Sequence, residues 1–491
     1  MKLTRTKTDN TQNYRITLPH RSFFNLLLGR ADFSAREFLQ SRYLIIGMVI
    51  LQLVWLAAIL WTGTSSNLSL ITFLAVYSLC AGLIALFLPE TFISKVRSFK
   101  AWLLQSPLRL FLILGLIVLI GGVFYASQQR AWGDEERSLR VARITAAEGV
   151  ENAYQQNGWL RRKHPPLMPL LYSMTLGFMG DGLFNLRLVS VVFMGATLII
   201  TYDLGRELYD RGTGYLAAFL FLLFPLVMRL GTSAMMDTQL TFFFALALLL
   251  CLRLVRAPSS WLAVLAGLVI GLGLLTKYIM VLIYGVLIVC ILVLPHFRRQ
   301  ARYFVLTGLT SLAVFSIWLI FAGQNGILAG QIDTIMRYSG IYHVATNAGT
   351  EIQPEEALPA PVTEEVAESN NLLKSGILRL GLETLFTRLP SSLGVHHLPL
   401  MLFAGLFLLK RREASDLFLL FWTGVVFIIL FLTLPDHRYF MAAFPAIAIM
   451  IARMFSRFPE STERAVLLSL LLLIGNLYLF VDWIREAHLF L

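Results

Sequence analysis

The sequence predicts an all-α membrane protein with about thirteen transmembrane helices and with amphipathic helices lying along the external membrane surface. Hydrophobic residues make up 57% of the 491 residues, and the mean hydropathy is +0.71. Apolar runs of roughly 18 to 22 residues recur along the chain, and a helix needs about 20 to cross the hydrocarbon. Strand-like alternation of apolar and polar residues is absent, which leaves helices as the spanning elements.

Thirteen apolar runs are predicted to span. They cover about 42–62, 68–88, 107–127, 185–206, 213–230, 238–256, 261–276, 278–295, 303–322, 396–410, 415–434, 437–455 and 463–484. A further run, 166–180, is short and rich in proline near its start. Length alone therefore does not decide whether it crosses.

Basic residues decide the direction of the chain, because they concentrate in cytoplasmic loops. With the basic residues 1–42 inside, the segment 89–106 returns inside and 128–165 lies outside. If 166–180 does not cross, the later basic connections also fall inside: Arg206/Arg211, Arg253/Arg256, Arg298/Arg299/Arg302, Lys410/Arg411/Arg412 and Arg453/Arg457. We therefore predict a surface helix at 166–180 and an external C-terminus. No apolar region of a signal peptide precedes the first predicted span.

The chain divides into two predicted parts. Residues 1–106 form a basic cytoplasmic segment and two additional spans, and 107–491 form a core with external loops at 128–184 and 323–395. Apolar residues in the first loop have the spacing of a helix that lies on the membrane: Leu139, Ala142, Ala146, Val150 and Ala153. The second loop holds an acidic stretch, 351–368, and then an amphipathic segment, 372–389.

Charge and cysteine content narrow the function classes. The net charge of +12 is typical of cytoplasmic loops, so no nucleic-acid partner is expected. Cys80, Cys251 and Cys290 lie in apolar runs without metal-ligand spacing, as buried structural cysteines do. No Gly-rich nucleotide-binding motif is present.

Ionisable residues from five segments fall on the predicted external side at membrane level. They are Asp134, Glu135, Glu136 and Arg137; Lys163 and His164; Asp237; Lys277; and Asp436, His437 and Arg438. Such groups are costly at this depth and tend to be paired or functional. Each also has a structural explanation: the aspartates as helix caps, Lys277 as a snorkelling side chain, and Arg438 with Tyr439 as interfacial anchors. Their convergence on one side favours function.

The order of several short motifs resembles a known superfamily. The motifs are Trp132-Gly133-Asp134-Glu135-Glu136-Arg137, Lys163-His164-Pro165-Pro166-Leu167, Phe184-Asn185-Leu186-Arg187-Leu188-Val189-Ser190, Asp203-Leu204-Gly205-Arg206-Glu207-Leu208-Tyr209, Met236-Asp237-Thr238, Gly273-Leu274-Leu275-Thr276-Lys277 and Arg438-Tyr439. From about residue 107 to 455 the chain resembles the GT-C superfamily of membrane glycosyltransferases. Within it, the chain is similar to the bacterial branch related to lipid A aminoarabinose transferases and protein O-mannosyltransferases (glycosyltransferase family 39-like).

This resemblance implies transfer of a sugar from a polyprenyl-phosphate donor to a hydroxyl of a lipid, glycan or protein. It places the reaction at the external, periplasmic face of a bacterial inner membrane. It also implies that Asp134 acts near the acceptor and the anomeric carbon, with Asp237 as the second acidic residue. We therefore predict that Asp134 is the general base and that Asp237 orients the acceptor or the base, or binds a metal, with Glu135 as a third candidate catalytic residue. The family commonly has Asp-Glu-x-Arg-Tyr in the first motif, whereas here Ser138 replaces the tyrosine.

A second departure concerns metal binding. The family often reads Glu-Lys-Pro-Pro where this chain reads Lys163-His164-Pro165-Pro166. The acidic residue on which a metal site would rest is therefore absent, although a divalent metal is left open as a cofactor. Lys163 or His164 still offers a basic group for the donor phosphate.

Elementary chemistry agrees with the resemblance. Breaking a sugar–phosphate bond develops positive charge on the sugar and negative charge on the phosphate. A carboxylate assists the first and cations the second. The candidate donor-binding residues are Arg137, Lys163, His164, Lys277, Arg438 and Tyr439, and a single inverting displacement is the simplest expectation. The alternative is a transporter or lipid flippase, in which ionisable groups usually lie at the bilayer midplane.

Overall fold

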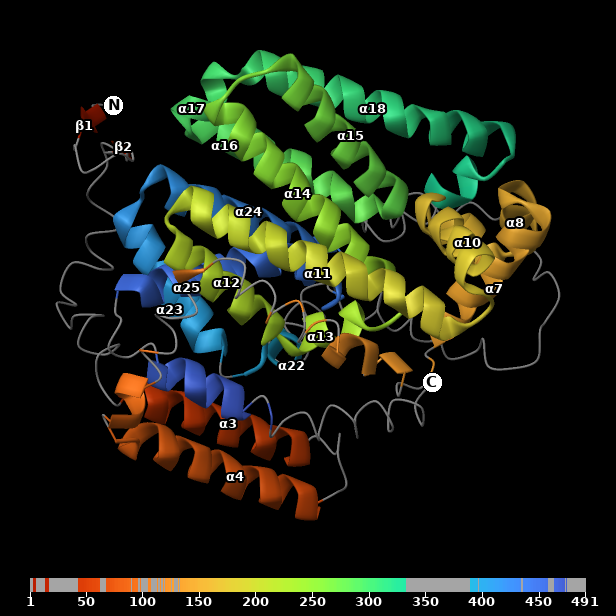
Figure 1. Ribbon diagram of the computed structural model, residues 1–491. Coiled ribbons are helices and arrows are strands. Elements are labelled where there is room, and N and C mark those ends of the chain that lie inside the picture. The colour runs from red at the N-terminus through yellow and green to blue at the C-terminus, as the bar shows by residue number, and fades with distance from the viewer. Residues whose placement is uncertain are drawn as a thin grey trace, which may run out of the picture.

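The computed structural model describes residues 133–332 without a break, most of 389–474, the segments 43–61 and 68–89, parts of 91–131, and residues 3–5 and 14–16. The described part is a bundle of helices (Figure 1). Its only strands are a short antiparallel pair, β1 (Leu3–Arg5) and β2 (Tyr14–Ile16). The predicted span 107–127 is described only in part. The acidic stretch 351–368, the segment 372–389 except for its last residue, and the end of the last predicted span lie outside the described residues.

Most predicted spans coincide with helices. These are α3 (Tyr43–Trp61), α4 (Leu68–Phe87), α11 (Leu183–Leu208), α14 (Met236–Arg256), α15 (Ser260–Thr276), α16 (Leu282–Val293), α18 (Ala301–Gln324), α23 (His397–Arg411), α24 (Ala414–Thr433), and η4 (Tyr439–Ala443) continuing into α25 (Phe444–Arg457). Among the described residues, five helices are long and apolar enough to cross a membrane, or six if one bent pair is a single span. The count of about thirteen spans therefore stays a prediction.

The bent pair corrects the predicted straight span at 213–230. Two helices, α12 (Arg211–Leu222) and α13 (Pro225–Gly231), meet at an angle of 69°. Pro225 stands in the first turn of α13, where its missing N–H is tolerated. The same ring would clash with the carbonyl four residues earlier in a continuous helix, so the span breaks here.

The centre of the bundle is α14, which packs against α11, α13, α15 and η4. Close approach is possible where glycines face each other: a Cβ on Gly205 of α11 would come within 2.8 Å of the Gly214 Cα of α12. On the outside, α18 carries a stripe of exposed apolar side chains suited to contact with lipid: Val305, Leu309, Leu312, Ile317 and Ile320.

A cap of short helices covers one end of the bundle, formed by α7 (Gly133–Glu148), α8 (Val150–Gln156), α9 (Gly158–Lys163) and α10 (Leu167–Met179) (Figure 1). The predicted continuous helix through Ala153 is wrong, because Gly149 adopts φ +89° and ends α7. Of the predicted apolar positions, Ala142 and Ala153 are buried but Ala146 is exposed, and the polar residues Glu135, Ser138 and Thr145 are buried as well. The ion pair between Glu135 and Arg187 of α11 draws this polar side of α7 inward.

The helix α10 is a part of the cap that contacts the bundle. It packs against α7, α11 and α15, and Asp181, just beyond its end, accepts a hydrogen bond from Arg143 Nε of α7 at 2.9 Å. With 13 residues, α10 is shorter than the helices that are long and apolar enough to span. Its position relative to a membrane stays a prediction.

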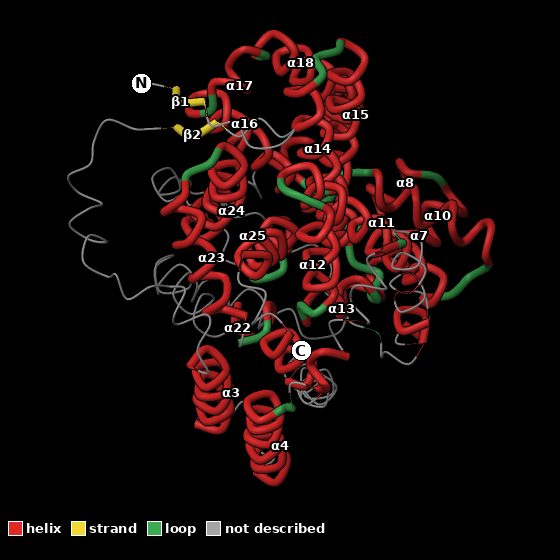
Figure 2. The backbone as a smooth tube through the Cα atoms, turned by 60° about the vertical axis from the view of Figure 1, so that its left-hand side comes forward, coloured by secondary structure: helices red, strands yellow, loops and turns green. Residues whose placement is uncertain are grey.

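The opposite end of the bundle gathers predicted cytoplasmic charges. Tyr209 donates a hydrogen bond to buried Asp416 at 2.7 Å, and Arg253 Nε lies 2.7 Å from Glu207 Oε1. These contacts join the ends of α11 and α14 to the start of α24 (Figure 2). Arg253 belongs to one of the predicted cytoplasmic connections, and the placement of all five on one side stays a prediction.

The N-terminal helix pair α3–α4 lies at the edge of the bundle (Figures 1 and 2). Arg464, at the start of the last predicted span, donates hydrogen bonds to the carbonyls of Ala85, Leu86 and Leu88 at 2.9–3.2 Å. These carbonyls belong to the end of α4, which has no helical partners for them.

Candidate functional site

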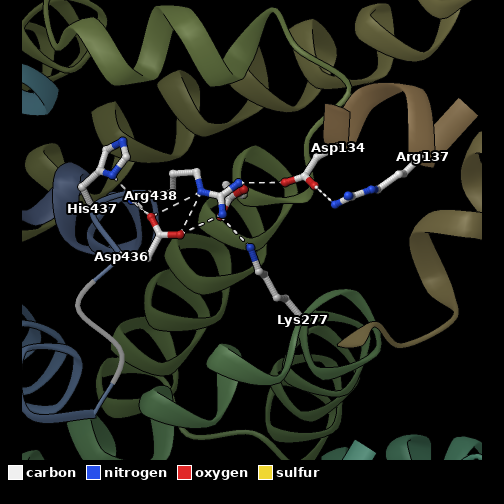
Figure 3. A network of polar contacts seen from close by, with 7 residues as sticks. Asp134, Arg137, Lys277, Asp436, His437 and Arg438 are labelled. Carbon is white, nitrogen blue, oxygen red and sulfur yellow. Dashed lines mark hydrogen bonds and ion pairs between the residues drawn. The ribbon is translucent and has the colours of Figure 1, made fainter. Parts of the chain in front are cut away.

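Arg438 is the centre of a polar network at the capped end (Figure 3). Its Nη1 lies 3.1 Å from Asp134 Oδ2, and its Nη2 lies 2.8 Å from Asp436 Oδ2. Asp134 Oδ1 also lies 3.3 Å from Arg137 Nη1, one turn along α7. One guanidinium thus joins two carboxylates from segments far apart in the chain, and its fork geometry suits such pairing.

Local structure positions both sides of this network. Asp134 is in the first turn of α7, directly after Gly133, where a carboxylate is favoured by the helix dipole. Asp436 Oδ1 accepts the backbone N–H of Arg438 at 2.9 Å, which fixes the turn before η4. His437 Nδ1 lies 3.4 Å from the same Asp436 oxygen.

The charges shift one another's pKa values. Burial alone would raise the pKa of Asp134, but Arg438 and then Arg137 overcome it, so the pKa lies below its usual range. The pKa of Asp436 is likewise lowered by Arg438 and His437 against burial. Both carboxylates are therefore ionised at neutral pH.

A second ion pair comes from the helix ends next to it. Lys277 Nζ lies 2.8 Å from Asp237 Oδ1, and the Asp237 side chain is only 2% exposed. Asp237 is in the first turn of α14, and Lys277 ends α15 in an extended conformation. The Lys277 ammonium also lies 4.2 Å from the centroid of the Tyr439 ring. Tyr439 is adjacent to Arg438, so the two ion pairs form one site.

Glu135 has a different environment from its neighbour Asp134. Its carboxylate is fully buried and pairs with both Nε and Nη2 of Arg187 at 2.8 Å. It also accepts the backbone N–H of Ala234 at 2.7 Å, while Arg187 donates to the carbonyl of Ala126. Glu135 was predicted to be catalytic, but this geometry uses its carboxylate to fasten α7 to α11, so we infer a positioning role instead.

Sequence reasoning missed the role of Arg187. The motif that contains Arg187 gave it no role of its own. An arginine inside the apolar run 185–206 is nevertheless a signal for a buried partner. The pair explains why the polar face of α7 is turned inward.

His164 ends α9 beside the same site. Its ring centroid lies 4.2 Å from that of Trp159. Burial and the charge of Lys277 lower its pKa to about 3, although Asp134 acts in the opposite direction. The ring is therefore neutral at neutral pH. Lys163 precedes it and is half-buried.

The acidic residues present do not suit a divalent cation. Asp134 and Asp436 share Arg438, and Asp237 faces Lys277. A cation would have to displace these partners. Within the described residues, no group of three or more His, Cys, Asp or Glu side chains is arranged to bind a metal.

Comparison with known proteins agrees with this architecture. Residues 163–321 match the family model of dolichyl-phosphate-mannose-protein mannosyltransferases. The undecaprenyl phosphate-α-4-amino-4-deoxy-L-arabinose arabinosyl transferase of Pseudomonas aeruginosa is 27% identical over 216 residues, which are 42% of this chain and 38% of the relative. The match thus spans well under half the length of that curated relative.

Solved structures give the same result for the fold. ArnT from Cupriavidus metallidurans bound to undecaprenyl phosphate superposes with a TM-score of 0.53 at 15% identity, covering 70% of this chain and 60% of that one. The apo form of that protein gives a TM-score of 0.50 at 16% identity, covering 73% and 60%. The resemblance inferred from the motifs is thereby confirmed: the chain is related to ArnT and the mannosyltransferases of the GT-C superfamily.

Proposed function

We propose that this GT-C relative transfers a sugar from a polyprenyl-phosphate donor to a hydroxyl group of a lipid, glycan or protein. The observation that carries the proposal is the meeting of Asp134 with Arg438 at 3.1 Å, beside the Lys277–Asp237 pair. A carboxylate and two cations at one helix-bundle end are the groups that glycosyl transfer from a phosphate requires. The ArnT match supports an undecaprenyl-type donor, since that protein binds undecaprenyl phosphate.

In this proposal the acceptor hydroxyl lies against Asp134, which removes its proton as the oxygen attacks the anomeric carbon. The bond from that carbon to the phosphate oxygen breaks, and its electron pair stays on the phosphate. Lys277 and Arg438 stabilise the growing negative charge. One attack from the side opposite the phosphate inverts the anomeric configuration.

Asp237 holds Lys277 toward the donor, and Tyr439 supports it from the other side. Arg137 pairs with Asp134 within α7 and helps to keep its carboxylate ionised. Lys163 and His164 border the donor phosphate. The polyprenyl chain stays between helices, so the head group reaches the capped end, which faces the periplasm of a bacterial inner membrane.

The transporter or flippase alternative has less support. The charged residues of this site lie at helix ends, on the cap and the adjoining turns, whereas transport sites favour broken helices near the midplane. The described bundle has one sharply bent pair, α12–α13, and none of the site residues named above belongs to it.

The deciding experiment is an in vitro assay of the purified full chain with a panel of polyprenyl-phosphate sugars and candidate acceptors. Mass spectrometry should detect both a glycosylated acceptor and released polyprenyl phosphate. The Asp134→Asn variant serves as the inactive control. Movement of intact donor across proteoliposomes without bond cleavage would favour the flippase instead.

A further inference from the structure

His164 is held rigidly by its surroundings. Its backbone carbonyl accepts hydrogen bonds from the Tyr154 hydroxyl at 2.8 Å and from Gln331 Nε2 at 3.1 Å. Its ring packs on Trp159 with centroids 4.2 Å apart. The backbone and the ring of His164 are therefore each held by neighbouring side chains.

The Nδ1 atom of this ring is buried and makes no hydrogen bond to any residue that the structure describes. A buried polar atom without a protein partner is costly, so the placement of this nitrogen calls for a functional explanation. Trp159 covers the ring with an aromatic face rather than a polar one.

Charged groups from several elements interact electrostatically with this ring. They are Asp134 on α7, Lys277 at the end of α15, and Arg438 before η4, with Lys163 adjoining His164 on α9. Arg161 and Arg162, also on α9, point to the backbone carbonyls of Gly326 and Gly158 instead. Tyr154 of α8 has a raised pKa because it is buried, so its hydroxyl stays neutral.

The permanent charges of the site are already paired. Three cations, Arg137, Arg438 and Lys277, lie against three carboxylates, Asp134, Asp436 and Asp237. The net charge of these six side chains is therefore zero, and Lys163 is a neighbouring cation outside this set.

The proposed reaction increases the negative charge. A polyprenyl-phosphate sugar is a phosphodiester with one negative charge, and the released polyprenyl monophosphate carries up to two, since the second pKa of a phosphate monoester is about 6. The acceptor hydroxyl meanwhile loses one proton. A group that keeps this proton beside the phosphate would balance both changes.

We propose that His164 is this group: it receives the acceptor's proton after attack, and as an imidazolium it pairs with the departing phosphate. This inference rests on the proposed function and deepens it. The acceptor O–H bond breaks, the new bond to the anomeric carbon forms, and the carbon–phosphate oxygen bond breaks. The proton passes through Asp134 to His164, so the charge gained by the phosphate is matched inside the site.

His164 suits this role because its imidazole can be neutral before the reaction and protonated after it. In the unoccupied site, burial and Lys277 keep the ring neutral, with a pKa of about 3. A phosphate dianion beside the ring raises that pKa, because an opposite charge favours the protonated form. A lysine there would instead be charged throughout the cycle.

The test is the number of protons taken up when the product-like phosphate binds. Farnesyl monophosphate is titrated into the purified full chain by calorimetry at pH 7.5, in buffers with different ionisation enthalpies. The wild type should take up close to one proton more than His164→Gln. His164→Lys should retain binding without the extra proton.

The control is His296→Gln in α17 (Pro295–Arg299), which follows α16 away from the site residues; it should match the wild type. Equal proton numbers for the wild type and both His164 variants would overturn the role of His164 and leave the glycosyltransferase proposal standing. Failure of the wild type to bind farnesyl monophosphate at all would instead count against the proposed function. Unchanged thermal unfolding of each variant shows that folding is not the cause.

Discussion

Asp134 Oδ2 and Arg438 Nη1 lie 3.1 Å apart although 304 residues separate them in the chain. The contact joins the first turn of α7 to the turn before η4, so the cap and the bundle meet at an ion pair. Asp134 is still 31% exposed, whereas neighbouring Glu135 is not exposed at all. Two adjacent carboxylates thus have different environments: Asp134 is partly exposed, whereas Glu135 is enclosed by protein.

Replacing Asp134 should stop transfer without unfolding the protein. Asp134→Asn keeps the shape but removes the base, and general-base catalysis contributes on the order of 10²- to 10⁴-fold in rate. Initial rates of product formation measure the loss. Asp181→Asn, which affects an exposed pair on the same cap, is the matched control. Full activity of Asp134→Asn would show that Asp134 is not the general base.

Replacing Glu135 should instead destabilise the protein. Glu135→Gln leaves the buried Arg187 without its charged partner, and breaking such a pair typically costs about 3–5 kcal/mol. Thermal unfolding in detergent should show a lower midpoint than for Asp134→Asn. Changing both partners, as Glu135→Gln with Arg187→Met, should recover part of the loss. A stable but inactive Glu135→Gln would return Glu135 to the catalytic set.

These two residues show how far the sequence could predict the site. Asp134, Asp237, Lys277 and Arg438 were expected on one side because the charge rule fixed the direction of the spans, and the structure brings all four together. The pairing itself was not predictable, since hydrophobic periodicity carries no information on which arginine meets which carboxylate. The burial of Glu135 against Arg187 was not foreseen, because adjacent residues of a helix point about 100° apart and so have different environments.

The fold was predictable to a similar extent. Long apolar runs located most helices, because burial and helix length act locally. The bend between α12 and α13 and the break at Gly149 depend on single residues, Pro225 and Gly149, within otherwise continuous patterns. Their effect is decided by what packs nearby.

Replacing Lys277 should mainly weaken use of the donor. Lys277→Ala removes a phosphate-binding cation and leaves Asp237 buried without its partner. We expect KM for the donor to rise at least tenfold, with a smaller change in KM for the acceptor. Lys277→Arg should recover part of the affinity. An unchanged KM for the donor would mean that Lys277 does not bind the donor and is a snorkelling side chain.

The pH dependence of transfer should reveal the influence of Arg438. Asp134 must be ionised to act as a base, and Arg438 lowers its pKa, so in the wild type this group limits the rate only below its ordinary pKa. In Arg438→Gln the burial of Asp134 acts without that opposition and raises the pKa. The acidic limb of kcat/KM should therefore move to higher pH. If the acidic limb does not move, ionisation of Asp134 does not limit kcat/KM.

The predicted topology can be tested by labelling single cysteines in a chain with Cys80, Cys251 and Cys290 replaced. Arg161→Cys and Asp181→Cys lie before and after α10, and Arg298→Cys lies in α17. The first two should react from the same side with a membrane-impermeant reagent, and the third only from the other. Opposite labelling of positions 161 and 181 would mean that 166–180 crosses.

The hydrogen bonds from Arg464 to the end of α4 have a consequence for biogenesis. The helix pair α3–α4 leaves the ribosome first, whereas Arg464 is translated 379 residues after Ala85. Until then, the last carbonyls of α4 lack this partner. Docking of this helix pair is therefore completed only after Arg464 has been synthesised, so a translation product interrupted before this residue would keep the pair loose and recognisable to quality-control proteases.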